Sequence, residues 1–586
     1  MRHPFARLII TTLLSISAIS AAPTDSSPAL RDLLKREWDW SMEQSPTWAS
    51  QLGDRRWNDR WPDLSAAANT RRNEHRKAVL KELDAIGANE LSPRDRLNLD
   101  LFRRGLLNDI SEFEFNLHLL PINQRGGIQT EDEEVDQLRF QTVKDYEDWI
   151  ARLNAFPAYM AQTIELLREG TKDKVVQPRV IMQRVPAQID HQIVEDATAS
   201  NFYKPFRRFP ETIPTADRDR LETAAALAIE RKVVPAFREL KKFFEAEYLP
   251  ACFKNVGAWQ LPRGDELYAF VAKQHTTTDL SPEQIHQIGL AEVARIRGEM
   301  EKVKEQAGFT GSLEEFFTFL RTDKRFFYSS GDELLAASRA LAKTIDPKLV
   351  KLFRILPRMP YGVEPIPENI APDTTTAYYQ QPAADGSRAG TYYVNLYKPE
   401  TRPKWEMPAL TLHEAVPGHH LQISRAMELG EQPEFRRYGG YSAFVEGWAL
   451  YCESMGEEIG MYEDPYDRFG RLTYEMWRAV RLVVNTGMHH KHWSRQQAID
   501  YFKANAPKSD LDITNEIDRY IGWPGQALAY KVGELKIKEL RKRAEAELGD
   551  KFDVRDFNDT VIGQGAVPLD ELERIVVAWI EKQKKR

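Results

Sequence analysis

One segment restricts the possible folds of this chain more than any other: residues 411–422, Thr-Leu-His-Glu-Ala-Val-Pro-Gly-His-His-Leu-Gln. It holds three of the chain's 12 histidines next to a glutamate, in mostly apolar surroundings. A Pro-Gly step at 417–418 separates the first histidine, His413, from the other two. Because a proline inside a helix removes a backbone hydrogen bond and clashes with the preceding turn, we expect the helix to break or kink at this step.

His413 and Glu414 match the first half of the His-Glu-x-x-His zinc motif, in which two histidines one helical turn apart bind the metal and the glutamate activates a water. The proline occupies the place of the second histidine. On an unbroken helix His419 would lie about 120° away from His413, and His420 about 10 Å along the axis. A break would return one of them to the metal, and zinc–nitrogen bonds of about 2 Å leave room for only one. The residues alone leave His419 and His420 open, and the alternative is a structural kink with surface histidines.

Glu446, in the stretch Glu-Gly-Trp-Ala-Leu-Tyr-Cys-Glu, is the candidate for the third ligand. The flanking Val445, Trp448 and Leu450 predict a buried helix. A carboxylate on such a helix is costly unless it is paired or bound to a metal. The alternative is a buried salt bridge with a nearby arginine.

Composition places the chain among ordinary globular proteins, because 42% of its 586 residues are hydrophobic and 29% are charged. The formal charge of −7 gives no reason to expect a nucleic-acid partner or an anionic membrane surface. Cys252 and Cys452 are the only cysteines, which excludes a disulfide framework and a cysteine-based zinc site. One bridge between them is conceivable, but two free buried thiols are the favoured interpretation.

The N-terminus has the pattern of a secretory signal peptide. Arg2 and Arg7 precede an apolar run from Leu8 to Ile19, which ends in small residues as far as Ala22. The run is shorter than the roughly 20 residues that span a bilayer, so we expect cleavage near the end of segment 1–22 rather than a membrane anchor. No cysteine follows the run, which argues against a lipid anchor. The expectation is an exported protein, periplasmic or secreted.

Helical periodicity dominates the rest of the chain, so the expected fold class is mainly α, a large helical fold with a small β-sheet beside the active-site cleft. Long helices are predicted at 178–198 and 216–248. Ser281-Pro-Glu-Gln has the features of a helix start, and the helix should run to about Ala307. A run of prolines after residue 356 suggests a division of 23–586 into an N-terminal helical lobe, 23–355, and a catalytic lobe, 356–586.

The clearest predicted strand lies in 385–397, shortly before the histidine segment. Tyr392 and Val394 alternate there with Tyr393 and Asn395, as expected for a half-buried strand. One interpretation is a structural strand of the small sheet. The other is a sheet edge that pairs with an extended peptide.

Three motifs together resemble one known family. His-Glu-Ala-Val-Pro-Gly-His-His-Leu-Gln (413–422), Glu-Gly-Trp-Ala-Leu-Tyr (446–451) and Pro-Gly-Gln-Ala-Leu-Ala-Tyr-Lys-Val-Gly (524–533) are similar to segments of the bacterial DUF885 family. This family is grouped with the gluzincin metallopeptidases. The resemblance covers most of the chain and is strongest from about 385 to 533.

The resemblance implies one zinc ion and assigns roles around it. In the family pattern the residue after Pro-Gly is histidine while the next position varies, which implies His413, His419 and Glu446 as ligands and Glu414 as the general base. Many gluzincins carry an aspartate four residues after the third ligand to orient a histidine. Leu450 stands there in this chain, so that support must come from elsewhere.

The third motif implies an oxyanion donor. In related helical peptidases a tyrosine in such a segment donates a hydrogen bond to the oxyanion, which makes Tyr530 the candidate, with Tyr520 behind it. The alternative is a packed aromatic residue between helices.

Five further residues are candidates for substrate binding, and for two of them, Arg481 and His489, a structural role is the alternative. They are Arg388, Tyr393, Asn395, Arg481 and His489.

The expected function is zinc-dependent hydrolysis of peptide bonds in short oligopeptides, with no membrane contact after signal cleavage. Two alternatives remain: a zinc amidohydrolase that acts on a non-peptide amide, and a non-catalytic peptide-binding protein, which the incomplete His-Glu-x-x-His motif suggests. The residues do not indicate the oligomeric state or the side chains preferred in a substrate.

Overall fold

The computed structural model describes residues 27–87, 91–368, 371–373, 375–383, 386 and 388–585. The predicted signal peptide, 1–22, and its cleavage site lie outside these residues. Within them, no helix combines the length and the apolar character needed to cross a bilayer.

The fold is mainly α, as predicted. The helices are α1 (Pro28–Gln44), α2 (Pro46–Gln51), α3 (Ala66–Asp84), α4 (Pro93–Glu114), α5 (Val143–Asp173), α6 (Arg179–Met182), α7 (Val185–His191), α8 (Thr215–Ala228), α9 (Val234–Phe243), α10 (Leu249–Ala251), α11 (Gly264–Thr276), α12 (Pro282–Gln306), α13 (Leu313–Thr322), α14 (Gly331–Ile345), α15 (Met407–Glu414), α16 (His419–Met427), α17 (Glu434–Tyr438), α18 (Ser442–Met455), α19 (Pro465–His489), α20 (Arg495–Asn505), α21 (Asp510–Gly522), α22 (Ala529–Leu548), α23 (Val554–Ile562) and α24 (Leu569–Lys584). The strands are β1 (Tyr361–Pro365), β2 (Ala377–Gln380) and β3 (Gly390–Val394).

Local sequence signals explain where several helices begin and end. The Ser281 hydroxyl accepts a hydrogen bond from the backbone N–H of Gln284, whose side chain accepts one from the N–H of Ser281, so α12 begins with a capping box. The predicted helix at 216–248 is confirmed, because π-turns join α8, α9 and α10 into one rod. The predicted single helix at 178–198 is wrong: α6 ends before Pro186, which lacks the N–H that a continuous helix needs, and α7 restarts around it.

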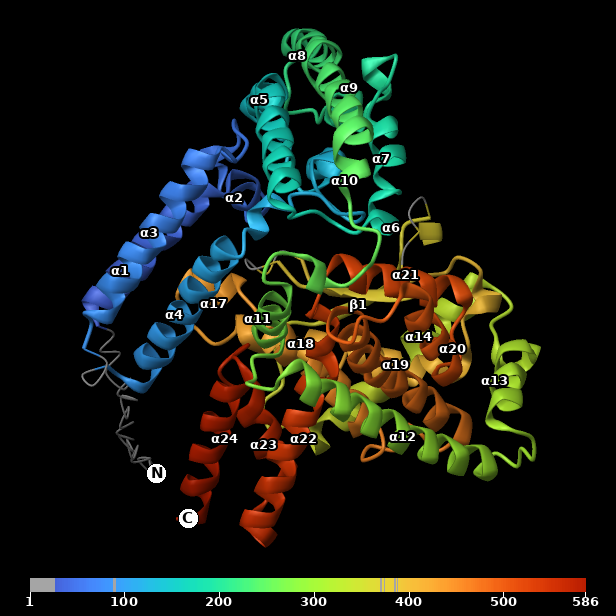
Figure 1. Cartoon of the computed structure of the whole chain (residues 1–586). Coiled ribbons are helices and arrows are strands. Elements are labelled where there is room, and N and C mark those ends of the chain that lie inside the picture. The colour runs from blue at the N-terminus through green and yellow to red at the C-terminus, as the bar shows by residue number, and fades with distance from the viewer. Residues whose placement is uncertain are drawn as a thin grey trace, which may run out of the picture.

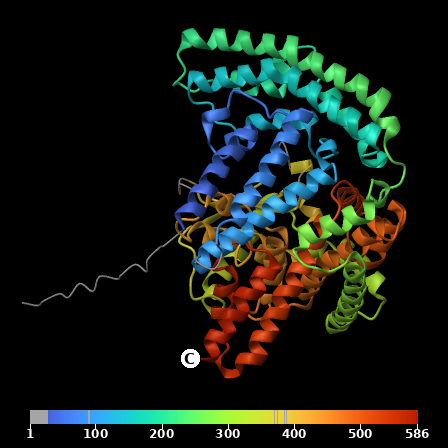
Figure 2. The ribbon, with the colours of Figure 1, turned by 60° about the vertical axis from the view of Figure 1, so that its left-hand side comes forward.

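The helices form an upper layer and a larger body (Figure 1). The upper layer contains α5, α7, α8 and α9, while α12, α19 and α22 belong to the body. The helices α1, α3 and α4 run along one flank. The second view shows the same upper layer lying across the body (Figure 2). The division into two lobes at 355/356 stays a prediction. Residues from both sides of this boundary share one buried cluster, which contains Tyr268 and Leu334 together with Trp448. Cys252 and Cys452 are both buried and free, as favoured.

The small sheet has the order β1-β3-β2. Along β3, Tyr392 and Val394 are buried while Tyr393 is partly exposed, as predicted, but the strand ends at Val394 and Asn395 is buried as well. β3 pairs in parallel with β1 and antiparallel with β2, so it is the central strand. The interpretation of β3 as a sheet edge that pairs with a peptide is therefore wrong, because β1 and β2 already pair with both of its edges.

Two glycines bring α18 and α22 into backbone contact. A Cβ on Gly533 would lie 1.9 Å from the carbonyl oxygen of Ala443, and a Cβ on Gly447 would lie 2.5 Å from the Cα of Gly533. No side chain fits at either position. The close approach holds the helix that carries Glu446 against the helix that carries Tyr530.

Candidate metal centre

The helix breaks where the Pro-Gly step predicts it. α15 ends at Glu414 and α16 begins at His419, with a cis peptide bond before Pro417. A Cβ on Gly418 would lie 1.8 Å from the carbonyl oxygen of His413, so only glycine permits the chain to fold back this closely. The carbonyl of Pro417 accepts a hydrogen bond of 2.9 Å from the indole N–H of Trp448, which fastens the break to α18.

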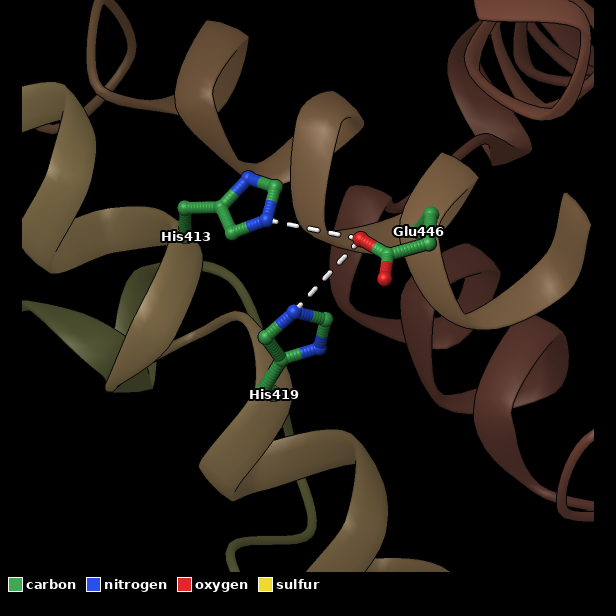
Figure 3. Close-up of side chains that lie close together, drawn as sticks. All are labelled: His413, His419 and Glu446. Carbon is green, nitrogen blue, oxygen red and sulfur yellow. Dashed lines mark ion pairs between the residues drawn. The ribbon is translucent and has the colours of Figure 1, made fainter. Parts of the chain in front are cut away.

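The break and α18 bring His413, His419 and Glu446 together (Figure 3). Oε2 of Glu446 lies 3.6 Å from Nε2 of His413 and 3.7 Å from Nε2 of His419, and the three ligand atoms lie within 4.8 Å of one another. The His413 side chain is 4% exposed, while those of His419 and Glu446 are 12% and 22% exposed. The cluster is thus reachable from solvent on the side of Glu446, and it can hold a metal ion.

The donor set fits a divalent cation such as zinc. Imidazole nitrogens and carboxylate oxygens are common zinc ligands. Bonds of about 2.0–2.1 Å in a tetrahedral site place two ligand atoms about 3.3 Å apart. This separation is slightly shorter than the 3.6 and 3.7 Å between Oε2 of Glu446 and the two imidazole nitrogens. Nε2 of His419 forms no hydrogen bond in the described part of the chain and faces Oε2 of Glu446 at 3.7 Å, whereas its Nδ1 is buried without a partner. The lone pair of Nε2 is therefore available to a metal ion without the loss of an existing hydrogen bond.

The charges of the cluster also favour a cation. Burial alone would lower the pKa of His413, but the carboxylates of Glu446, at 3.6 Å, and Glu453, at 2.8 Å, raise it to about 9. Burial would raise the pKa of Glu446, but the two histidines lower it to about 2. Burial lowers the pKa of His419 to about 4. The shifts of His413 and Glu446 have one cause, the attraction between the imidazoles and the carboxylates, which favours positive charge at this point, either a proton or a bound cation.

Glu453 orients His413. Its Oε1 lies 2.8 Å from Nδ1 of His413, its side chain is 1% exposed, and Nη2 of Arg478 lies 3.8 Å from the same oxygen. The hydrogen bond fixes the imidazole so that Nε2 faces Glu446. Support for His413 from a residue other than Leu450 was expected, but Glu453 was not identified as that residue. The available signal was the spacing of seven residues, which places Glu446 and Glu453 on one face of α18.

The structure does not bring His420 into the cluster. Its Nδ1 lies 2.8 Å from the Tyr379 hydroxyl and its Nε2 lies 3.1 Å from the carbonyl oxygen of Met359. Both ring nitrogens are therefore engaged within the protein, and His420 fastens α16 to the sheet.

Glu414 lies beside the cluster at the end of α15. It is half-buried, and its carboxylate forms no hydrogen bond or ion pair with any residue that the structure describes. Burial is the main cause that raises the pKa of Glu414 to about 7. The nearby His413 lowers this pKa, and the Glu446 carboxylate raises it. An unpartnered carboxylate next to a metal cluster is available for proton transfer.

Tyr530 lies in the first turn of α22, where burial and then the nearby Glu446 carboxylate raise the pKa of its hydroxyl. Its hydroxyl forms no hydrogen bond within the described residues. The Tyr520 hydroxyl, in contrast, is 2.5 Å from Glu516 and accepts a hydrogen bond of 2.8 Å from Arg481. Of the two tyrosines, only Tyr530 has a hydroxyl left to donate.

Two of the proposed substrate contacts belong to the sheet and its loop. Tyr393 lies on the face opposite Tyr392 and stacks on Tyr378 at 5.0 Å between ring centroids. Asn395 is fully buried and donates hydrogen bonds to the carbonyls of Ala371 and Thr375. In this structure Asn395 shapes the loop between β1 and β2 rather than facing the cluster.

His489 and Arg388 form no hydrogen bond or ion pair with the three ligands among the residues that the structure describes. His489 is fully buried; its Nδ1 accepts from the N–H of Ala258 and its Nε2 donates to the carbonyl of Tyr520, which joins two segments of the body. Arg388 is exposed and lies near the hydroxyl of Tyr379. Of the five candidates, only Arg481 contacts a residue at the cluster.

Comparisons with known proteins agree with this architecture. The profile of the DUF885 family, described as bacterial proteins of unknown function, matches residues 46–576. The crystal structure of a candidate lipoprotein from Colwellia psychrerythraea is 31% identical, covers 94% of this chain and 99% of its own, and has a TM-score of 0.86. The structure of a candidate lipoprotein of unknown function from Shewanella oneidensis is 18% identical in sequence and has a TM-score of 0.74. It covers 94% of this chain and 99% of its own.

The search of curated proteins returned no match. The family profile spans most of the chain, and the Colwellia psychrerythraea structure exceeds 30% identity over nearly its whole length. The chain therefore belongs to the DUF885 family of bacterial proteins.

Proposed function

We propose that this protein is a zinc-dependent hydrolase that cleaves peptide bonds in short oligopeptides, with a gluzincin-like site. The observation that carries the proposal is the convergence of His413, His419 and Glu446, from three helices, beside the unpartnered carboxylate of Glu414. His413, His419 and Glu446 would hold the zinc ion, and Glu453 would orient His413.

Zinc bound there would polarise a carbonyl and make a water more acidic. Glu414 would accept the proton of the attacking water and pass it to the leaving amine. Tyr530 would donate a hydrogen bond to the oxygen on which negative charge develops. These roles match the free carboxylate and the free hydroxyl that border the cluster.

Short peptides are the proposed substrates because the cluster is mostly buried. The exposed fraction is 22% for the Glu446 side chain and 12% for that of His419, so an extended segment reaches the site more easily than a folded surface. We also propose that the protein is exported, periplasmic or secreted. The predicted signal peptide supports this, and two similar structures carry the name lipoprotein.

The test is a peptide-library digest of the protein purified without chelator, together with metal analysis. The expected result is about one zinc per chain, cleavage of short peptides, loss of cleavage after chelation and recovery with added zinc. Cleavage of non-peptide amides alone would favour an amidohydrolase. Peptide binding without zinc and without cleavage would favour a binding protein and refute the proposal.

A second expected result separates the two adjacent histidines. His419→Ala should abolish stoichiometric zinc binding, because one of three ligands is lost. His420→Asn should retain zinc, because its ring is already engaged by Tyr379 and Met359. Metal analysis of both purified variants decides between them, and zinc retained by the first but lost by the second would reverse the assignment.

A further inference from the structure

The wall next to Tyr530 is built around one buried guanidinium. Cζ of Arg481 lies 4.3 Å from the centroid of the Tyr530 ring and 5.2 Å from that of Trp477. We propose that Arg481 is a positioning residue, which holds the Tyr530 ring so that its hydroxyl stays directed to the metal cluster. The proposal rests on the proposed function of Tyr530 as the oxyanion donor.

Tyr530 needs such a support because nothing polar holds it. Its hydroxyl forms no hydrogen bond with the residues described, so only packing restrains the two side-chain torsions of the ring. A cation over the face of a tyrosine ring is an attractive contact, and it is stronger where water is excluded. The Arg481 side chain is 6% exposed, so the contact is largely desolvated.

Arg481 is itself held at two of its three nitrogens. Nε donates to the Tyr520 hydroxyl at 2.8 Å, and Nη2 donates to Oε2 of Glu516 at 3.1 Å. Nη1 is buried and has no hydrogen-bond partner. The contact with the Tyr530 ring is thus made by a guanidinium whose position two hydrogen bonds already fix.

The base of this wall is rigid. Arg519 donates to Glu516 through Nε at 3.1 Å and Nη2 at 3.0 Å, and the Tyr520 hydroxyl lies 2.5 Å from the same carboxylate. These residues belong to α21, while Arg481 belongs to α19 and Tyr530 to α22. Three helices thus meet at Arg481, and the planar fork of arginine serves both the hydrogen bonds and the stack, which lysine cannot do.

This arrangement predicts that Arg481 acts on the reaction only through Tyr530. Tyr530→Phe should lower kcat about 100-fold, as loss of an oxyanion donor does elsewhere. Arg481→Met should lower kcat about 10- to 100-fold with KM and zinc content nearly unchanged, because a ring displaced by about 1 Å loses most of its effect. Arg481→Lys should not restore kcat.

The decisive measurement is the double variant. Arg481→Met in the Tyr530→Phe background should cause no further loss of kcat, whereas independent roles would give additive losses and overturn the proposal. Arg541→Met is the matched control. Arg541 lies farther along α22, and it also donates to a tyrosine hydroxyl, that of Tyr451, and to a glutamate, Glu458. The control variant should leave kcat unchanged.

Crystal structures of the wild type and Arg481→Met provide a readout that does not depend on activity. The Tyr530 hydroxyl should move by about 1 Å or more, and an unmoved ring overturns the proposal. If the wild type cleaves no peptide, the proposed function fails while this comparison still decides the positioning role. If Arg481→Met does not fold, Tyr520→Phe takes its place: it removes one anchor and should lower kcat only when Tyr530 is present.

Discussion

Glu414→Gln is expected to abolish turnover while zinc stays bound. Glutamine has nearly the same shape as glutamate but cannot accept a proton, and His413, His419 and Glu446 are unchanged. A general base contributes about 10²- to 10⁴-fold, so kcat should fall by about 10³-fold. The measurement pairs kcat on the best library peptide with the zinc content of the same preparation.

The control for this variant is Glu428→Gln. Glu428 is a partly buried glutamate near the end of α16, and it accepts hydrogen bonds from the backbone N–H groups of Arg358 and Met359. It should keep both activity and zinc. If Glu414→Gln retained most of its activity, another group would have to take the proton, and the assignment of Glu414 would be wrong.

A second large effect concerns a buried ammonium directly after Tyr530. Lys531 is fully buried, and its Nζ lies 2.9 Å from Glu292, 2.8 Å from Glu475 and 2.6 Å from Glu534. These carboxylates come from α12, α19 and α22. Burial alone would lower the pKa of Lys531, but the three carboxylates raise it above its usual value, so the lysine stays charged.

Lys531→Met should therefore destabilise the protein strongly. Removing the ammonium leaves three buried carboxylates with only the more exposed cations Arg295, Arg471 and Lys538, and loss of a buried partner costs about 3–5 kcal/mol of the free energy of unfolding. Urea denaturation followed by tryptophan fluorescence and circular dichroism measures the change.

Lys538→Met is the matched control for that experiment. Lys538 lies on the same helix and contacts Glu534 at 2.5 Å, but its side chain is 34% exposed. Its removal should cost less than about 1 kcal/mol, because the Lys538 ammonium is already partly solvated and the buried Glu534 keeps its ion pair with Lys531. Equal losses in the two variants would show that burial of Lys531 contributes nothing special to stability.

Much of this fold followed from local chemistry. The Pro-Gly step breaks the helix between His413 and His419 because of what proline and glycine do to any helix. Ser281 and Gln284 cap α12 through bonds between near neighbours, and the alternation at Tyr392 and Val394 follows from the period of a strand. Such features involve residues within a few positions of one another, which is why they could be predicted.

Contacts between distant segments could not be predicted in this way. β3 was expected as a possible edge, yet β1 and β2 pair with both of its sides. His489 was expected near the substrate, yet the backbone groups of Ala258 and Tyr520 engage its ring. In both cases the deciding partners lie outside the segment that was being interpreted.

The sequence by itself determined that the chain is mainly helical, that its helix is interrupted at residues 417–418, and which histidines and carboxylates are available for a metal. The family resemblance implied His419 rather than His420, but only the tertiary structure showed that His419 meets Glu446 and that Glu453 supports His413. The physical reason is that metal ligands must converge within a few ångströms. That convergence depends on how α15, α16 and α18 pack, and no single segment contains this information.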